Sequence, residues 1–165
     1  MKKTFKPKRA STVLRWIEAG AFEKAREEVE QRLQVSPTDA EALFFRGACA
    51  LREGLIDHAA VDFSAAAALD PSDARFLNAT GAICLLKGQP EDALAICEMV
   101  LEISPKNAPA LTNQVVALVR LERYAEALPF AEQLMSLDPV GLRILANVCM
   151  PHPQLKSIQM KSSSL

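Results

Sequence analysis

Four prolines recur along this chain at a fixed interval. They stand at Pro37, Pro71, Pro105 and Pro139, and each is 34 residues from the next. Each one closes a similar triplet, since the four sequences read VSP, LDP, ISP and LDP. A period of about 20–50 residues is the signature of stacked repeat proteins, in which each copy buries its apolar face against its neighbours. The chain is therefore expected to consist of tandem copies of one small structural unit.

Five further columns of residues keep the same period and describe that unit. They are an alanine column (Ala25, Ala59, Ala93, Ala127), an apolar column (Val35, Leu69, Ile103, Leu137), a leucine column (Leu43, Leu77, Leu111, Leu145) and two glycine columns (Gly20, Gly54, Gly88 and Gly47, Gly81). A glycine suits the left-handed residue that ends a helix, and a proline cannot continue a helix. The columns therefore indicate two helices joined by a turn. In the last copy Glu122 and Val115 replace the two glycines.

Composition agrees with an all-α chain. Half of the residues are hydrophobic but only 5% are aromatic, and the abundant Ala, Leu, Glu, Arg and Gln favour helices. No alternation of Val, Ile and Thr supports a sheet. Thr38, followed three places later by Glu41, is typical of a capping box that opens a helix. Pro129 lies well inside an expected helix, which predicts either a kink or a late helix start.

The pattern resembles the tetratricopeptide repeat, a unit of 34 residues that follows roughly W-x2-L-G-x2-Y, then A-x3-F, then P. The copy at residues 40–73 matches best, through Leu43, Gly47, Gly54, Ala59, Phe63, Ala66 and Pro71. The copies at 74–107, 108–141 and 6–39 match less fully, and the last two are degenerate. The resemblance implies a right-handed α-solenoid of stacked antiparallel helix pairs, with about four copies. Residues 142–150 are expected to form a partial capping helix.

The two ends of the chain fall outside the four copies. Residues 1–5 begin a basic segment that we expect to be a disordered tail, and residues 151–165 contain two prolines and a serine run that predict an irregular tail. The segment 142–150 is apolar and short, so one neighbouring copy cannot cover it. We therefore expect self-association through this C-terminal end, or a partner or further sequence that covers it.

The resemblance also implies a binding groove. Proteins of this family contact ligands mainly through fixed positions of the first helix of each copy, which lines the concave face. Those positions hold Phe44, Phe45, Ala48, Leu51 and Arg52 in the second copy, Arg75, Asn78, Ala82 and Leu85 in the third, and Thr112, Asn113, Val116 and Arg120 in the fourth. Apolar, arginine and asparagine side chains together suit an amphipathic helix or an extended apolar segment that carries acidic residues. The alternative is that several of the apolar side chains simply pack between copies.

No motif for catalysis or for metal binding is evident. The sequence contains no G-x-S-x-G, no glycine-rich phosphate loop and no H-E-x-x-H, and its carboxylates are typical of solvated helix faces. Cys49, Cys84, Cys97 and Cys149 have no C-x-x-C spacing and are expected to be free thiols that pack as small hydrophobes. We therefore expect neither an enzyme nor a cofactor.

Charge and hydropathy restrict the partners. The net charge of −1 gives no field that would collect nucleic acid or acidic membranes, and no segment is long and apolar enough to cross a bilayer. Without a signal peptide, the chain is expected in the cytoplasm. The sequence therefore predicts an interaction scaffold that binds another protein. Two alternatives stay open: a secretion-type chaperone, suggested by an architectural likeness to type III secretion chaperones, and a regulatory module of a larger enzyme or complex.

Overall fold

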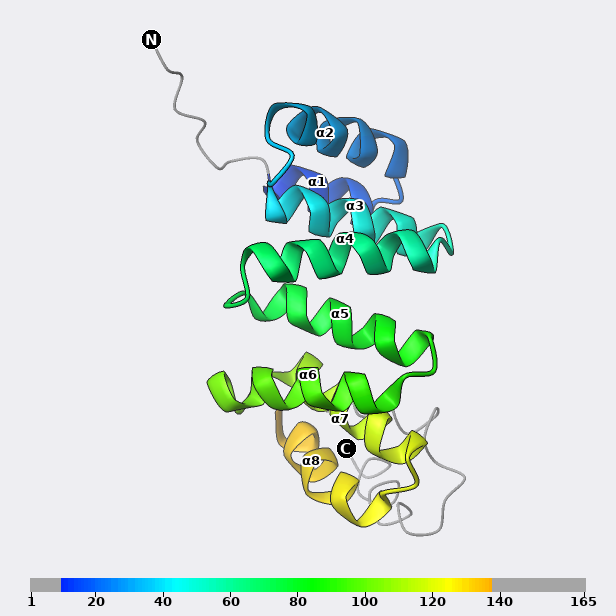
Figure 1. Ribbon diagram of the computed structural model, residues 1–165, viewed down its shortest axis with the longest axis vertical. Coiled ribbons are helices and arrows are strands. Elements are labelled where there is room, and N and C mark those ends of the chain that lie inside the picture. Colours follow the sequence, from blue (N-terminus) through cyan, green and yellow to red (C-terminus); the bar gives the residue numbers. More distant parts are fainter. Residues whose placement is uncertain (1–9, 138–165) are drawn as a thin grey trace. The chain divides into compact units, whose positions relative to one another are not determined.

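The computed structural model describes residues 10–137, and this part of the chain is entirely helical and turn, without strands. Figure 1 shows the helices. Their bounds are α1 (Ala10–Glu18), α2 (Phe22–Val35), α3 (Ala40–Arg52), α4 (Ile56–Leu69), α5 (Ala74–Leu86), α6 (Pro90–Ile103), α7 (Ala108–Arg120) and α8 (Tyr124–Leu137). Each of the four predicted copies thus contains two helices. The predicted tail at 1–5, the capping helix at 142–150 and the tail at 151–165 lie outside the described residues.

A residue with positive φ lies in the turn between the two helices of every pair. Three of these residues are glycines, with φ values of 72° at Gly20, 79° at Gly54 and 74° at Gly88. Glu122 takes the same place in the fourth pair with φ of 59°. Nothing lies within 4 Å of a Cβ added at any of the three glycines, so the backbone conformation, and not lack of space, favours glycine there. Glu122 therefore carries a local backbone strain that the other turns avoid.

Side-chain caps start three of the first helices, and one of them is Asp73, which accepts a hydrogen bond of 2.9 Å from the Arg75 amide at the start of α5. The Asp39 carboxylate accepts a hydrogen bond of 3.0 Å from the Ala42 amide, so Asp39 is the N-cap of α3. The predicted capping box at Thr38 is therefore wrong by one residue. Arg32, at the end of α2, donates to both carboxylate oxygens of Asp39 at 3.0 and 2.9 Å, which fixes the turn between consecutive helix pairs. Asn107 caps α7 in the same way through the Ala110 amide.

The chain divides into two compact units between Phe76 and Leu77, within α5. In the N-terminal unit, α1 packs on α2 and α3, and α3 packs on both α2 and α4. The core of this unit draws on all of these helices and on Phe76, and its most deeply buried members include Val13, Val29 and Ala42. Val13 occupies a place where the repeat pattern has a small residue, yet it is fully buried and contributes to the core.

In the C-terminal unit, α7 packs on both α6 and α8. Its two buried clusters centre on Leu111 with Leu134, and on Leu118 with Ala93. Pro129 lies inside α8, which begins at Tyr124, so the late helix start that the sequence allowed does not occur. The kink at Pro129 remains a prediction.

The thiols in the described residues are free, and two of them are buried. Cys49 and Cys97 lie in the interior, whereas Cys84 is half-buried. Burial raises the pKa of all three thiols, and it raises the pKa of Cys97 to about 12. These thiols are therefore neutral near pH 7 and pack as small hydrophobes, as the sequence predicted. Cys149 lies outside the described residues.

Candidate functional site

One face of α3 presents partly exposed apolar side chains in the N-terminal unit. Phe44, Ala48 and Leu51 are each half-buried and follow one another at helical spacing, while Arg52 is exposed at the end of the helix. Phe45 differs, because it is only 3% exposed and belongs to the core. Of the residues expected on this helix to line a groove, Phe45 therefore packs inside, as the alternative interpretation allowed.

An aromatic cluster holds the exposed part of this face in place. The Phe44 ring lies 5.6 Å from Phe45, 5.5 Å from Phe63 and 5.3 Å from Phe76, measured between ring centroids. Tilted and edge-on pairs at such distances are favourable for aromatic rings. Phe44 is thus fixed by three neighbours while part of its surface remains open to solvent.

Arg75 lies over this cluster. Its guanidinium carbon is 5.9 Å from the centroid of Phe44 and 5.4 Å from that of Phe76, and its side chain is 56% exposed. Asp73 holds the same guanidinium through hydrogen bonds of 2.6 to 3.1 Å, and Glu41 lies 3.7 Å away. The hydrogen bonds from Arg75 lower the pKa of Asp73, and those to Asp73 raise the pKa of Arg75. Both groups are therefore charged near neutral pH.

In the C-terminal unit, asparagines form a chain of hydrogen bonds. Asn78 donates through its amide to the side-chain oxygen of Asn107 at 3.0 Å, and Asn113 donates to the backbone oxygen of Asn78 at 3.0 Å. The Asn78 side-chain oxygen is buried and makes no hydrogen bond within the described residues. Asn78 and Asn113 were both expected to line the groove, and their amide groups are engaged within the unit.

The remaining predicted groove residues of this unit differ in exposure. Ala82, Thr112 and Val116 are half-buried, and Thr112 donates to the Ala108 carbonyl at 2.9 Å. Arg120 is exposed, and it donates a hydrogen bond to the backbone oxygen of Leu85. Leu85 itself is 6% exposed and packs in the core with Leu94 and Leu118, so it offers little surface to a partner.

The N-terminal unit also contains an ion pair that the repeat pattern did not predict. Arg46 and Asp62 form a two-point ion pair with hydrogen bonds of 2.9 and 2.7 Å, although Asp62 is only 5% exposed. The sequence feature that could have predicted this pair is Asp62 itself, a carboxylate within an apolar stretch of α4. Such a residue needs a partner in the interior.

Within residues 10–137, no group of three or more His, Cys, Asp or Glu side chains is arranged to hold a metal ion. None of the described helices has the length and apolar character that a membrane crossing requires.

Residues 57–108 match the sequence model of the tetratricopeptide repeat. This stretch runs from the second helix of one predicted copy through the whole of the next. Among curated proteins, none matches the sequence.

Solved structures share the fold over most of the chain. MamA 41-end from Desulfovibrio magneticus RS-1 is 20% identical with a TM-score of 0.73, and the match covers 96% of this chain and 95% of that one. TTC0263, a thermophilic TPR protein in Thermus thermophilus, is 18% identical with a TM-score of 0.73, covering 93% and 87%. YrrB, described as a TPR protein with an unusual peptide-binding site, is 14% identical with a TM-score of 0.69, covering 93% and 82%. These likenesses confirm the predicted all-α solenoid fold.

Proposed function

We propose that this chain, which is a tetratricopeptide repeat protein, is a non-catalytic scaffold that binds an amphipathic helix or an extended segment of another protein. The bound segment would present apolar side chains to the exposed face of α3 and a carboxylate to Arg75. YrrB, a protein of the same fold, is described as having a peptide-binding site, and this supports a peptide as the kind of ligand.

The observation that carries the proposal is the arrangement of Arg75 and Phe44. An arginine over two aromatic rings loses little side-chain freedom on binding, because its position is already restricted. Asp73 occupies the Nε and Nη2 groups of this guanidinium, whereas Nη1 has only the longer contact of 3.7 Å with Glu41. Because the side chain is more than half exposed, a partner carboxylate would bind at Nη1 while a neighbouring apolar side chain covers Phe44. The proposed binding residues of the N-terminal unit are Phe44, Ala48, Leu51, Arg52 and Arg75. In the C-terminal unit, taken by itself, the predicted residues that keep exposed surface are Asn78, Ala82, Thr112, Asn113, Val116 and Arg120.

The test uses the full chain and a labelled amphipathic peptide in which leucine alternates with aspartate, and it measures binding by fluorescence anisotropy. Arg75→Gln removes the charge but keeps a side chain of similar length. Because Arg75 is exposed, we expect the dissociation constant to rise by about two- to fivefold. Far-UV circular dichroism of the variant should be unchanged.

Arg123→Gln is the matched control. Arg123 is also an exposed arginine that holds a neighbouring carboxylate, Glu126, at 2.7 Å, but it directly precedes α8 in the C-terminal unit. If both variants weaken binding of the peptide equally, the peptide is attracted by the overall charge of the chain and the proposed site is wrong. Equal binding by Arg75→Gln and the unaltered chain would also contradict it.

The two alternative functions predict different partners. A secretion-type chaperone should keep an aggregation-prone partner soluble, which light scattering of the partner measures with and without this chain. A regulatory module should change the activity of an enzyme that binds to it. The scaffold proposal stands if partners bind at the α3 face without either effect.

A further inference from the structure

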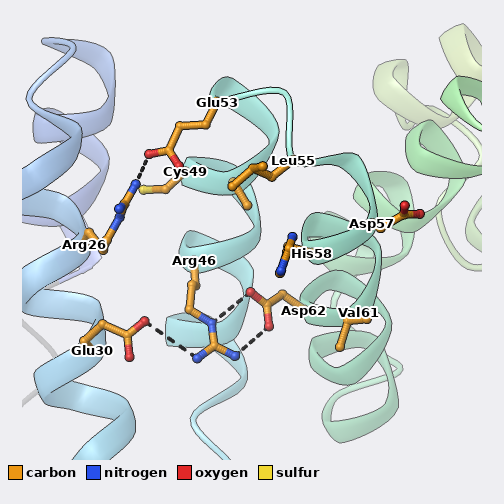
Figure 2. Close-up of a pocket in the computed structure, with 11 residues that line it drawn as sticks. Arg26, Glu30, Arg46, Cys49, Glu53, Leu55, Asp57, His58, Val61 and Asp62 are labelled. Carbon is orange, nitrogen blue, oxygen red and sulfur yellow. Dashed lines mark hydrogen bonds and ion pairs between the residues drawn. The ribbon is translucent and has the colours of Figure 1, made fainter.

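A pocket lies in the N-terminal unit, on the opposite side of α3 from the face proposed above. This pocket has a volume of about 600 Å³ and is lined by side chains from α2, α3 and α4 and from the turn before α4. Arg46 and Cys49 of α3 line it together with Glu53, the residue after the helix, and their spacing places them away from Phe44 and Ala48. Figure 2 shows these side chains around the pocket.

The two arginines of the pocket are already neutralised by carboxylates. Arg46 donates to both oxygens of Asp62 at 2.9 and 2.7 Å and has a longer contact of 3.7 Å with Glu30. Arg26 pairs with Glu53. Hydrogen bonding to Asp62 raises the pKa of Arg46, so this cation keeps its charge. Figure 2 shows the Arg46 guanidinium between Glu30 and Asp62.

The lining carries an excess of negative charge. Its four carboxylates are Glu30, Glu53, Asp57 and Asp62, and its two guanidinium groups are those of Arg26 and Arg46. Glu53 and Asp62 are engaged by the two arginines, and in Figure 2 the Asp57 carboxylate points away from Arg46. Glu30, whose contact with Arg46 is long at 3.7 Å, is therefore the carboxylate that can receive a further cation. A lining with more carboxylates than guanidinium groups attracts cations and repels the acidic segment proposed for the other face of α3.

Apolar side chains stand beside these charges. Leu55 is 46% exposed and Val61 is 69% exposed, and both line the pocket together with Ala50. Exposed apolar groups next to a concave surface mark sites where a partner side chain can be buried. Figure 2 shows Val61 on α4 and Leu55 at the turn that precedes this helix.

We infer that this pocket binds a peptide segment that carries a lysine or arginine next to an apolar side chain of about leucine size. The apolar side chain covers Val61 and Leu55, and the cation lies against Glu30 and its neighbouring carboxylates. The chain would then present two faces of opposite preference, one for acidic and one for basic segments, and could hold two partners at once. This site is independent of the groove at Arg75.

The test uses the full chain and a labelled peptide in which leucine alternates with lysine, measured by fluorescence anisotropy beside a matched peptide with glutamate in place of lysine. Val61→Lys replaces the exposed apolar side chain with a like charge, and we expect the dissociation constant of the lysine peptide to rise by about tenfold. Glu30→Gln should raise it by about two- to fivefold, because an exposed charge pair is lost.

Met99→Lys is the matched control, since Met99 is 52% exposed on α6 of the other unit. The proposal is supported if Met99→Lys binds the lysine peptide as tightly as the unaltered chain does, whereas Val61→Lys binds it more weakly. The glutamate peptide should also bind the unaltered chain weakly. The proposal is overturned if Val61→Lys and Met99→Lys behave alike, or if both peptides bind equally. Self-association of the chain that Val61→Lys abolishes would also overturn it, because the occupant would then be a second copy. Arg75→Gln should leave the dissociation constant of the lysine peptide unchanged. The proposal for this pocket and the proposal for Arg75 can therefore be refuted separately.

Discussion

Two glycines at the same place in successive repeats, Gly47 and Gly81, should respond to alanine with opposite signs. A Cβ added to Gly47 would lie 2.8 and 2.9 Å from two ring carbons of Phe63, closer than real Cβ atoms approach. A Cβ added to Gly81 would meet the Ile96 side chain at 3.6 Å and Asn113 at 3.7 Å, which is ordinary van der Waals contact. The same mutation therefore overpacks one repeat and fits the other.

The magnitudes follow from two opposing effects. Alanine is better than glycine within a helix by about 0.8–1.0 kcal/mol. Overpacking a core costs about 1–3 kcal/mol, and the upper part of this range applies to Gly47 because Phe63 is buried and its ring rests against Phe44. We therefore expect Gly47→Ala to lower the free energy of unfolding by about 1–2 kcal/mol. Gly81→Ala should raise it by about 0.5–1 kcal/mol.

Urea and thermal unfolding, followed by far-UV circular dichroism, measure both changes. Each 1 kcal/mol corresponds to about 2–4 °C in Tm for a chain of this size. The variants Phe63→Leu and Gly47→Ala/Phe63→Leu serve as controls, since Gly47→Ala should cost less stability when a smaller side chain in place of Phe63 relieves the contact. A change of the same sign at Gly47 and Gly81 would refute the reasoning, because helix propensity alone would then explain both.

Three further predictions concern single residues. Glu122→Gly should raise the free energy of unfolding by about 1 kcal/mol, since glycine adopts positive φ without strain; urea unfolding measures it, and a loss of stability would contradict the strain argument. Asp62→Ala should lower the free energy of unfolding by about 1–3 kcal/mol, because Arg46 loses both hydrogen bonds to this carboxylate. Asp70→Ala, at an exposed turn, should lower the free energy of unfolding by less. The pKa of Cys97 is raised to about 12, so its contribution to stability is complete below the unfolded pKa of about 8.5 and is lost as pH rises from there towards 12, by up to about 1.4 kcal/mol per pH unit. Cys97→Ala should therefore show a shallower fall in Tm between pH 8.5 and 10.5 than the unaltered chain, and equal slopes would contradict the burial of this thiol.

The period of the prolines and glycines was sufficient to predict the helix pairs. The turns at Gly20, Gly54 and Gly88 lie where the glycine column placed them, because a left-handed residue leaves a strong mark on the sequence.

Features that depend on a specific neighbour could not be predicted in this way. The N-cap of α3 is Asp39 and not Thr38, and what distinguishes them is Arg32, which reaches Asp39 from the preceding helix. Phe45 and Leu85 occupy positions that the repeat pattern assigns to a groove, yet both are buried in these cores. Whether such a side chain faces solvent depends on the size of the side chains packed against it, which a periodic pattern does not specify.

The ion pairs of Arg46 couple the unfolding of three helices in the N-terminal unit. Arg46 belongs to α3, yet it contacts Asp62 on α4 and Glu30 on α2, so a single guanidinium joins neighbouring helix pairs. In a linear array, fraying from an end stops where the coupling between adjacent copies is strong. Opening of α2 would leave Arg46 with fewer partners and weaken the contact between α3 and α4. Amide hydrogen exchange in these three helices should therefore proceed as one cooperative event, so that the N-terminal unit does not unfold helix by helix.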